Sequence, residues 1–211
     1  MAGDKPLPRL ATAAGSDTGP VDSPDEACHV GRRAMTIEIR MADSEDIDPF
    51  MSHLELVQAQ SGRDGVPIFT PFSPDQPADY TKMRERRLTG WAIPISQCGW
   101  RRAWAAIDDG VVVGDLELQG GSIPSEMHRA ALGMALQSTY SGQGLGTRLM
   151  EAAIQWSRDQ GLEYIDLGVF DGNEPAMRLY DRFGFERVGI RRDAFRVGED
   201  KVDDILMVLA L

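Results

Sequence analysis

Three glycines separated by single residues stand directly before a stretch with the pattern of a helix. The stretch reads TYSGQGLGTRLMEAA and spans residues 139–153, with glycines at 142, 144 and 146. Glycine destabilises a helix interior by roughly 0.5–1 kcal/mol relative to alanine, so its repetition here needs a local reason. The first turn of a helix has backbone N–H groups without intrahelical partners, at the positive end of the helix dipole. Because glycine lets a ligand approach the backbone closely, the pattern predicts an anion-binding turn between a strand and a helix.

The anion-binding turn lacks the features of two common phosphate-binding motifs. A P-loop needs a lysine after its last glycine, and no lysine follows here. The dinucleotide-binding pattern GxGxxG fails because the third glycine comes one residue early. A pyrophosphate held by main-chain N–H groups remains as one interpretation, and an ordinary glycine-rich turn remains as the other. The residues of the predicted site are Gly142, Gln143, Gly144, Leu145, Gly146 and Thr147.

Composition limits the partners of the chain. Among 211 residues, 33 are acidic and 22 basic, and the formal net charge of −11 argues against a general nucleic-acid-binding protein. The two cysteines, Cys28 and Cys98, lack the spacing of a zinc site or a disulfide scaffold. We therefore expect no metal site and a reducing compartment, the cytoplasm. No apolar run reaches about 18 residues and no signal-peptide pattern opens the chain, so we expect no membrane segment.

The first 35 residues differ in composition from the rest. They contain four prolines, several glycines, serines and aspartates, and no Phe, Trp or Tyr. Such a segment buries too little apolar area to offset its ordering entropy, so residues 1–35 are predicted to be a disordered tail. A second interpretation is that translation starts at Met35. In either case the predicted domain covers residues 36–211.

Periodicity predicts an α+β domain with the element order βααβββαβαββ around one mixed sheet. Asp109 and Gly110 form a type I′ turn signal between two strands. The expected strands are 36–42, the two arms of the hairpin 104–119, and 128–137, 164–170, 186–192 and 204–210. The expected helices are about 45–60, 80–87, a third that starts at the glycine-rich stretch and runs to about 160, and a fourth from the Asn173 cap to Gly184.

A second motif, NEPAMRLYDRFGF, spans residues 173–185. Ala176, Leu179, Tyr180 and Phe183 lie on one face of the predicted helix, so this face is expected to pack in a core. On this evidence alone Tyr180 is a core aromatic residue with its hydroxyl at the rim.

In this order and spacing, the two motifs resemble the GNAT superfamily of acetyl-CoA-dependent N-acetyltransferases. The shared pattern is a glycine-rich acyl-CoA loop, one helix, one strand, and then N-x-x-A-x-x-L-Y-x-x-x-G-F. The resemblance covers roughly residues 36–211 and is sharpest over residues 128–185. It implies a mixed, mostly antiparallel central sheet with helices on both faces, and acetyl-CoA as co-substrate.

The resemblance also assigns roles to individual residues. The glycine-rich residues 142–147 match the loop that holds the pyrophosphate of coenzyme A. Asn173 matches a polar residue near the pantetheine arm, and Tyr180 matches the general acid that protonates the departing thiolate. The residues that match the strand whose backbone pairs with pantetheine are Met134, Ala135 and Leu136.

Three positions depart from the family pattern. Ser141 stands where the family usually has Arg or Gln. Gly168 stands where ribosomal-protein alanine acetyltransferases carry a glutamate, and Ala131 where other members carry an acid. Glu117 and His128 are the remaining candidates for the general base. The alternative interpretations, which are the more common ones for such residues, are a surface carboxylate for Glu117 and a loop histidine for His128.

The resemblance implies that the acceptor enters between the first two helices and the last two strands, where the linker 61–77 and the hairpin around Gly198 would line the entrance. Arg191, Arg192 and Arg196 are candidates to hold a substrate carboxylate, and the alternative is a solvated run on an edge strand.

Three functions fit the sequence. The first is an acetyltransferase for a small-molecule amine or amino acid, with no nucleic-acid or membrane partner. The second is a protein N-terminal or lysine acetyltransferase, and the third a non-catalytic acyl-CoA-binding sensor. A homodimer is one assembly open to all three.

Overall fold

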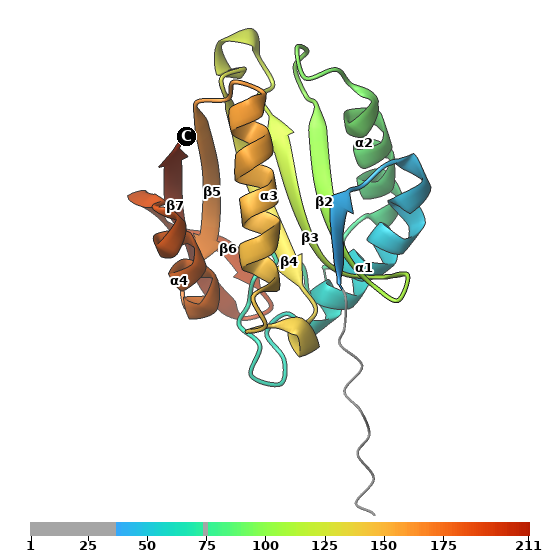
Figure 1. The fold of residues 1–211 in the computed structure, drawn as a ribbon. Helices are drawn as coiled ribbons and strands as arrows, with labels where there is room; N and C mark the ends of the chain where they lie inside the picture. The colour runs from blue at the N-terminus through green and yellow to red at the C-terminus, as the bar shows by residue number, and fades with distance from the viewer. Residues whose placement is uncertain (1–36, 74–75) are drawn as a thin grey trace, which may run out of the picture. The chain divides into compact units, whose positions relative to one another are not determined.

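A seven-stranded sheet forms the centre of the protein (Figure 1). The computed structural model describes residues 37–73 and 76–211, which belong to one structural unit, Met35–Leu211. The strands are β1 (Glu38–Met41), β2 (Arg101–Asp108), β3 (Val111–Gly120), β4 (Arg129–Leu136), β5 (Tyr164–Phe170), β6 (Glu186–Val197) and β7 (Asp200–Ala210). Their order is β1-β2-β3-β4-β5-β7-β6, and all neighbours are antiparallel except the parallel pair β4 and β5. The expected mixed, mostly antiparallel sheet is confirmed.

Helices cover both faces of the sheet, as expected. They are α1 (Ile47–Gln60), α2 (Tyr80–Ala92), α3 (Leu145–Asp159) and α4 (Glu174–Phe183). In Figure 1, α3 crosses the near face of the sheet, and α1 and α2 belong to the other face. Because side chains alternate along a strand, β2 sends Ala103 and Ala105 into the core under α1 and α2, and Trp104 and Ala106 into the core under α3.

Local signals in the sequence placed several turns correctly. Asp109 and Gly110 have φ of 49° and 82°, as a type I′ turn between β2 and β3 requires. Gly184 ends α4 with φ of 85°. Asn173 caps the same helix, because its side chain accepts a hydrogen bond from the Ala176 backbone N–H at 3.4 Å. Each of these signals lies within a few residues of the structure it determines.

Several elements extend beyond their predicted ends, and one of them, β2, begins at Arg101 rather than at residue 104. Helix α2 runs to Ala92 rather than to residue 87, and includes Gly90. A Cβ at Gly90 would lie 2.7 Å from Arg101 Cδ, so close packing on β2 explains the glycine inside a helix. The hairpin of β6 and β7 is also longer than expected, and register shifts along β6 interrupt its regular pattern.

A short capped turn precedes the first long helix. Asp43 caps a short 3-10 helix, Ser44–Asp46, and this turn leads directly into α1. Two further 3-10 helices, Pro124–Glu126 and Ser138–Tyr140, lie before and after β4.

The predicted tail, residues 1–35, lies outside the described residues, so its disorder and the domain boundary at residue 36 stay predictions. Among the helices of residues 37–73 and 76–211, none combines the length and the hydropathy that crossing a bilayer requires.

Candidate active site

Strands β4 and β5 pair over a short length and then part. Their register contains three pairs, which end at Ala131 and Asp166, although both strands continue. The rest of β4 stays paired with β3 as far as Leu136. The second half of β4 therefore has one edge that no described strand covers.

Backbone groups on this free edge point into the gap. Gln137 donates its backbone N–H to Val113 on β3 at 3.0 Å. Because successive N–H groups of a strand point to opposite sides, Ala135 also points toward β3, whereas Met134 and Leu136 point away from it. The N–H groups of Met134 and Leu136 thus face the gap between β4 and β5.

The glycine-rich turn follows β4 and leads into α3. Gly142 and Gly144 have φ of 74° and 80°, which side-chain-bearing residues rarely adopt, and a Cβ at either position would meet no other atom within 4 Å. Gly144 is the N-cap of α3, and no side chain provides a cap hydrogen bond. The turn is therefore open to an incoming ligand.

The backbone N–H groups of residues 142–147 donate no hydrogen bond to any other described residue. The neighbouring donors are engaged, because Ser141 donates to Ser138 and Arg148 donates to Gly144. Six consecutive free donors at the positive end of a helix dipole form a site for an anion.

The third glycine of the motif has a different function from the first two. Gly146 is buried in the first turn of α3, and a Cβ there would lie 3.1 Å from Leu179 Cδ2 on α4. The same Cβ would lie 3.6 Å from side-chain atoms of Met134 and Leu136 on β4. Gly146 therefore allows α3, α4 and β4 to meet closely behind the turn.

Side chains of the turn contribute to its shape. Gln143 donates from its side-chain amide to the Thr139 carbonyl at 2.7 Å, which ties the turn to the preceding 3-10 helix. Thr147 Oγ1 accepts a hydrogen bond from Arg182 on α4 at 3.3 Å. Ser141 is exposed, and within the described chain its side chain makes no hydrogen bond.

Tyr180 lies on α4, directly after Leu179, which contacts the start of α3. Its ring packs in the core beside Phe185, with ring centroids 5.6 Å apart. Burial raises the pKa of Tyr180 to about 12. The hydroxyl has no hydrogen-bond partner among the described residues, and its oxygen is not completely buried.

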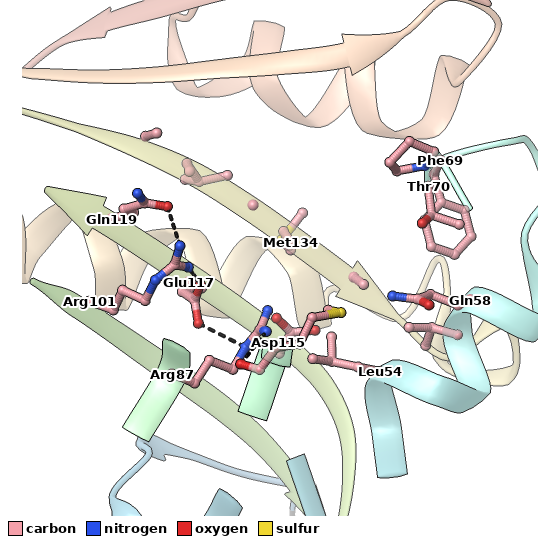
Figure 2. A pocket seen from close by; sticks show the side chains of 17 residues that line it. Leu54, Gln58, Phe69, Thr70, Arg87, Arg101, Asp115, Glu117, Gln119 and Met134 are labelled. Carbon is pink, nitrogen blue, oxygen red and sulfur yellow. Dashed lines mark hydrogen bonds and ion pairs between the residues drawn. The ribbon is translucent and has the colours of Figure 1, made fainter. Parts of the chain in front are cut away.

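A cavity of about 370 Å³ opens on the face of the sheet that carries α1 and α2 (Figure 2). Asp115, Glu117 and Gln119 alternate along β3 and point into it. Their partners on β4 are small, because Ala135, Gly133 and Ala131 lie opposite them. Polar side chains therefore rise from a floor of small residues, which leaves space above the free half of β4.

Other elements close the sides of the cavity. Figure 2 shows Phe69 and Thr70 across the cavity from Arg101, Glu117 and Gln119. The predicted linker 61–77 thus lines the cavity through residues 69–71, while the hairpin around Gly198 is not part of its lining. The remaining lining residues are Leu54, Val57 and Gln58 of α1, Met83 and Arg87 of α2, and Leu132 and Met134 of β4.

Glu117 is held by two arginines. It is buried, accepts a short hydrogen bond from Arg101 through Oε1, and has Oε2 3.1 Å from Nε of Arg87. The second pair is not aligned for a hydrogen bond, so Oε2 and the Arg87 Nε are buried polar atoms without one. Arg101 also donates to Gln119. Glu117 is therefore a cavity carboxylate that is already paired with two cations.

A second buried pair was not predicted from the sequence. His53 on α1 lies with Nε2 3.0 Å from Oδ1 of Asp115 on β3. The His53 side chain is fully buried, and Asp115 lines the cavity. The alternation of Asp115, Glu117 and Gln119 along one strand could have identified the carboxylate, but the His53 partner is 62 residues away.

The structure does not bring His128 to the cavity. His128 is exposed at the other end of β4, where its ring meets Tyr164 edge to face at 6.0 Å. Ala131 lines the cavity floor without an acidic group. Gly168 lies on β5 with the carboxylate of Asp204 directly above it.

The arginines of β6 each pair with an aspartate. Arg191 binds Asp204, Arg192 binds Asp203, and Arg196 binds Asp193. Because β6 is an edge strand and all three side chains are more than half exposed, these contacts fit the solvated-run alternative. None of the three lines the cavity.

Solved structures with the same fold cover most of the chain. An acetyltransferase of the GNAT family from Streptococcus pneumoniae aligns with a TM-score of 0.68 and 21 % identity, over 83 % of this chain and 99 % of that one. YncA from Salmonella typhimurium, solved with its cofactor acetyl-CoA, aligns with a TM-score of 0.67 and 17 % identity, over 83 % and 94 %. At these identities the similarity establishes the fold.

Curated relatives match shorter regions at higher identity. Mycothiol acetyltransferase of Rhodococcus jostii (strain RHA1) is 36 % identical over 112 residues, which make up 50 % of this chain and 34 % of that protein. L-amino acid N-acetyltransferase AaaT of Escherichia coli (strain K12) is 34 % identical over 96 residues, 43 % and 57 % of the two chains. The ribosomal protein bS18-alanine N-acetyltransferase of the same strain is 32 % identical over 78 residues, 37 % and 53 %. The chain thus matches less than two thirds of the length of each relative.

The model of the acetyltransferase (GNAT) family matches residues 69–185, which is more than half of the 211 residues. The match runs from the cavity-lining loop to the glycine and phenylalanine after α4, and includes β4, the glycine-rich turn and α3. The fold agrees, since the chain aligns with the solved GNAT-family acetyltransferase from Streptococcus pneumoniae over most of its length. The chain belongs to the acetyltransferase (GNAT) family.

Proposed function

We propose that this protein is an N-acetyltransferase that transfers an acetyl group from acetyl-CoA to a primary amine of a small molecule, with amino acids as the first class to test. The observation that carries the proposal is the set of six free backbone N–H groups at residues 142–147. They stand at the positive end of α3, where a pyrophosphate is bound most favourably.

The residues around the turn fit acetyl-CoA. Met134 and Leu136 direct backbone N–H groups into the gap beside β4. The extended pantetheine arm of acetyl-CoA can hydrogen-bond to them there, as an added β-strand does. Asn173 uses its side-chain oxygen to cap α4 and keeps its amide N–H groups for a ligand. When bound, acetyl-CoA supplies the activated thioester.

The chain offers donors for the charge that develops during transfer. A backbone N–H at Met134 or Leu136 can stabilise negative charge on an acyl oxygen, as an oxyanion hole does. Tyr180 can deliver a proton to the departing sulfur. Because burial raises its pKa to about 12, Tyr180 keeps its proton throughout the physiological pH range.

The cavity supports a small, charged acceptor. Its charged lining consists of two carboxylates, Asp115 and Glu117, and two guanidinium groups, Arg87 and Arg101. An amino acid carries both signs of charge, so each end can find an opposite charge in such a cavity. The similarity to L-amino acid N-acetyltransferase AaaT supports the same class.

A protein N-terminus is the second candidate acceptor. The similarity to the bS18-alanine N-acetyltransferase favours it. An N-terminal residue presents the same ammonium group as a free amino acid, but it brings a peptide in place of the carboxylate.

The cytoplasmic location of the protein and its assembly as a homodimer stay predictions.

The proposal is tested by a screen for coenzyme A release. Wild-type protein is incubated with acetyl-CoA and each of the twenty standard amino acids, a panel of polyamines, or peptides with free N-termini. We expect thiol release with at least one amino acid and acetylated amine by mass spectrometry. Release with peptides alone selects the second candidate. Tight acetyl-CoA binding by calorimetry without release from any amine selects the non-catalytic sensor and contradicts the proposal.

A further inference from the structure

The buried pair of His53 and Asp115 has no place in the functions assigned so far. Transfer to an amine needs a group that accepts the ammonium proton, because a protonated amine has no lone pair for attack. The sequence left this proton acceptor unassigned between Glu117 and His128. Of these two, His128 lies outside the cavity and Glu117 is already paired with two arginines, whereas Asp115 lines the cavity without an arginine partner.

In the hydrogen bond between the two residues, His53 is the donor and Asp115 the acceptor. Nε2 of His53 lies 3.0 Å from Oδ1 of Asp115, and a carboxylate oxygen accepts. Nδ1 of His53 is buried and has no hydrogen-bond partner in the described parts of the chain. A charged ring would place a second N–H where no acceptor lies, so the neutral ring that donates through Nε2 suits this site.

Asp115 keeps its second oxygen for the cavity. Oδ1 is hydrogen-bonded to His53. Oδ2 makes no hydrogen bond within residues 37–73 and 76–211, and it is not completely buried. The side chain lines the cavity although it is only 5 % exposed. One oxygen is therefore fixed and the other faces the space where an acceptor amine can bind.

The position of Asp115 in the sheet brings this oxygen to the transfer point. Asp115 pairs with Ala135 on β4, and Cα atoms in a hydrogen-bonded antiparallel pair are about 5.5 Å apart. Ala135 lies between Met134 and Leu136, the two residues whose N–H groups face the gap. The carboxylate and the free edge of β4 thus meet at one cross-strand pair.

The charged groups around Asp115 distinguish it from its neighbour Glu117. The groups that line the cavity with it are Arg87 of α2, Arg101 of β2 and Glu117 of β3, while α1 contributes His53 and β4 contributes no charge. Both arginines are paired with Glu117. Asp115 is therefore the cavity carboxylate that neither arginine pairs with.

We propose that Asp115 accepts the proton of the acceptor ammonium, and that His53 is a positioning residue that holds Oδ1 so that Oδ2 faces the amine. This inference rests on the proposed acetyltransferase function. The proton moves from the ammonium nitrogen to Oδ2, and the freed lone pair forms the C–N bond as the C–S bond breaks. Asp115 then releases its proton to solvent, and the new amide nitrogen loses its remaining extra proton to solvent. The thiolate receives a proton from Tyr180, which regains one from solvent.

The kinetic test is Asp115→Asn with an amine that wild type acetylates. We expect kcat/KM to fall by about 10²–10⁴-fold near neutral pH, with the affinity for acetyl-CoA unchanged by calorimetry. The loss should shrink as pH rises, because more of the amine then arrives without its extra proton. Asp159→Asn, an exposed carboxylate at the end of α3, is the control and should leave turnover unchanged. A loss that is the same at every pH, or no loss, overturns the inference.

A spectroscopic test needs no turnover. The chain has three histidines, and ¹⁵N-histidine spectra assigned with His53→Gln report which ring nitrogen carries the proton. We expect His53 to be protonated at Nε2 and bare at Nδ1. In Asp115→Leu, which removes the acceptor, this preference should weaken. A His53 ring that is bare at Nε2 overturns the positioning role.

Failure of the inference and failure of the proposed function give different results. If wild type acetylates no amine or peptide in the screen, the proposed function fails and the proton-acceptor role fails with it. If wild type is active and Asp115→Asn remains fully active, only the inference fails. Circular dichroism of each variant separates loss of folding from either result.

Discussion

The carboxylate of Asp204 lies directly above Gly168. A Cβ at position 168 would be 2.5 Å from Oδ1 and 2.8 Å from Oδ2 of Asp204. Asp204 is buried on β7 and is bound by Arg191 of β6, so it has little freedom to move. The glutamate that the family resemblance places at this position in ribosomal-protein alanine acetyltransferases does not fit here. A carboxylate from a neighbouring strand occupies the space instead.

Gly168→Ala should destabilise the domain without entering the acceptor cavity. The new methyl group must displace a buried, ion-paired carboxylate, and overpacking of this kind typically costs about 1–3 kcal/mol. The measurement is the free energy of unfolding from urea denaturation, with the melting temperature as a second readout. We expect both to fall.

Gly189→Ala is the matched control for this prediction. Gly168 and Gly189 flank the same residue of β7, Leu206, from opposite sides. A Cβ at Gly189 would meet only Leu206 Cδ1, at the ordinary contact distance of 3.8 Å. Equal stability changes in the two variants would show that Asp204 does not restrict position 168.

Gly144→Asp should abolish tight binding of acetyl-CoA and leave the fold intact. A Cβ at position 144 would meet no other atom within 4 Å, and the charge of the aspartate repels a pyrophosphate. Gly144→Asn is the control, because Asn and Asp both tolerate the φ of 80° better than other side chains do. Calorimetry should show a much larger loss of affinity for Asp than for Asn. Equal affinities of wild type and Gly144→Asp would contradict the assignment of the turn.

Short-range patterns made much of the fold predictable. The Asp109 and Gly110 turn, the Asn173 cap and the alternation along β3 depend on neighbouring residues, so the sequence displays them directly. The ends of α2, β6 and β7 depend on distant contacts. Gly90, for example, is accepted inside α2 because Arg101 packs against it.

The candidate site also has one part that neighbouring residues make predictable and another part that depends on distant contacts. Residues 142–147 form a continuous segment whose glycines indicate an anion site, and the structure adds that the missing side chain of Gly146 allows close packing against Leu179. The pair of His53 and Asp115 joins a helix and a strand 62 residues apart. A single histidine on the apolar face of α1 gives no local sign of such a partner. His128 was a candidate because it directly precedes β4, but it lies at the end of β4 that is away from the cavity.

Removal of residues 1–34 should leave activity and melting temperature nearly unchanged. The segment has no Phe, Trp or Tyr and is rich in proline, glycine and aspartate, so it has little to contribute to a core. The measurement compares the full chain with the chain that begins at Met35, by differential scanning calorimetry and by coenzyme A release. A melting midpoint several degrees lower would show that the segment packs on the domain.

The raised pKa of Tyr180 predicts a specific response to alkaline pH. An unfolded tyrosine has a pKa of about 10, and burial raises the pKa of Tyr180 to about 12. The folded state therefore holds this proton more tightly, and its contribution to stability is complete below pH 10 and is lost as pH rises from about 10 to 12. Urea denaturation across this range should show a steeper loss of stability in wild type than in Tyr180→Phe. Parallel profiles would contradict the buried, protonated hydroxyl.

Tyr180→Phe should slow turnover while the affinity for acetyl-CoA stays close to normal. Phe keeps the ring that packs beside Phe185 and removes only the hydroxyl. General acid catalysis is typically worth about 10²–10⁴-fold, and we expect a loss within or below this range because a thiolate leaves readily without full protonation. The measurement is kcat at saturating acetyl-CoA between pH 6 and 9.5, with Tyr164→Phe as the control. Tyr164 lies on β5 beside Arg129 and His128, at the paired end of β4 and β5. Since Tyr180 stays protonated well above pH 9.5, the deficit should be independent of pH, unlike that of Asp115→Asn. Unchanged kcat at a step shown to be limited by chemistry would return Tyr180 to a packing role.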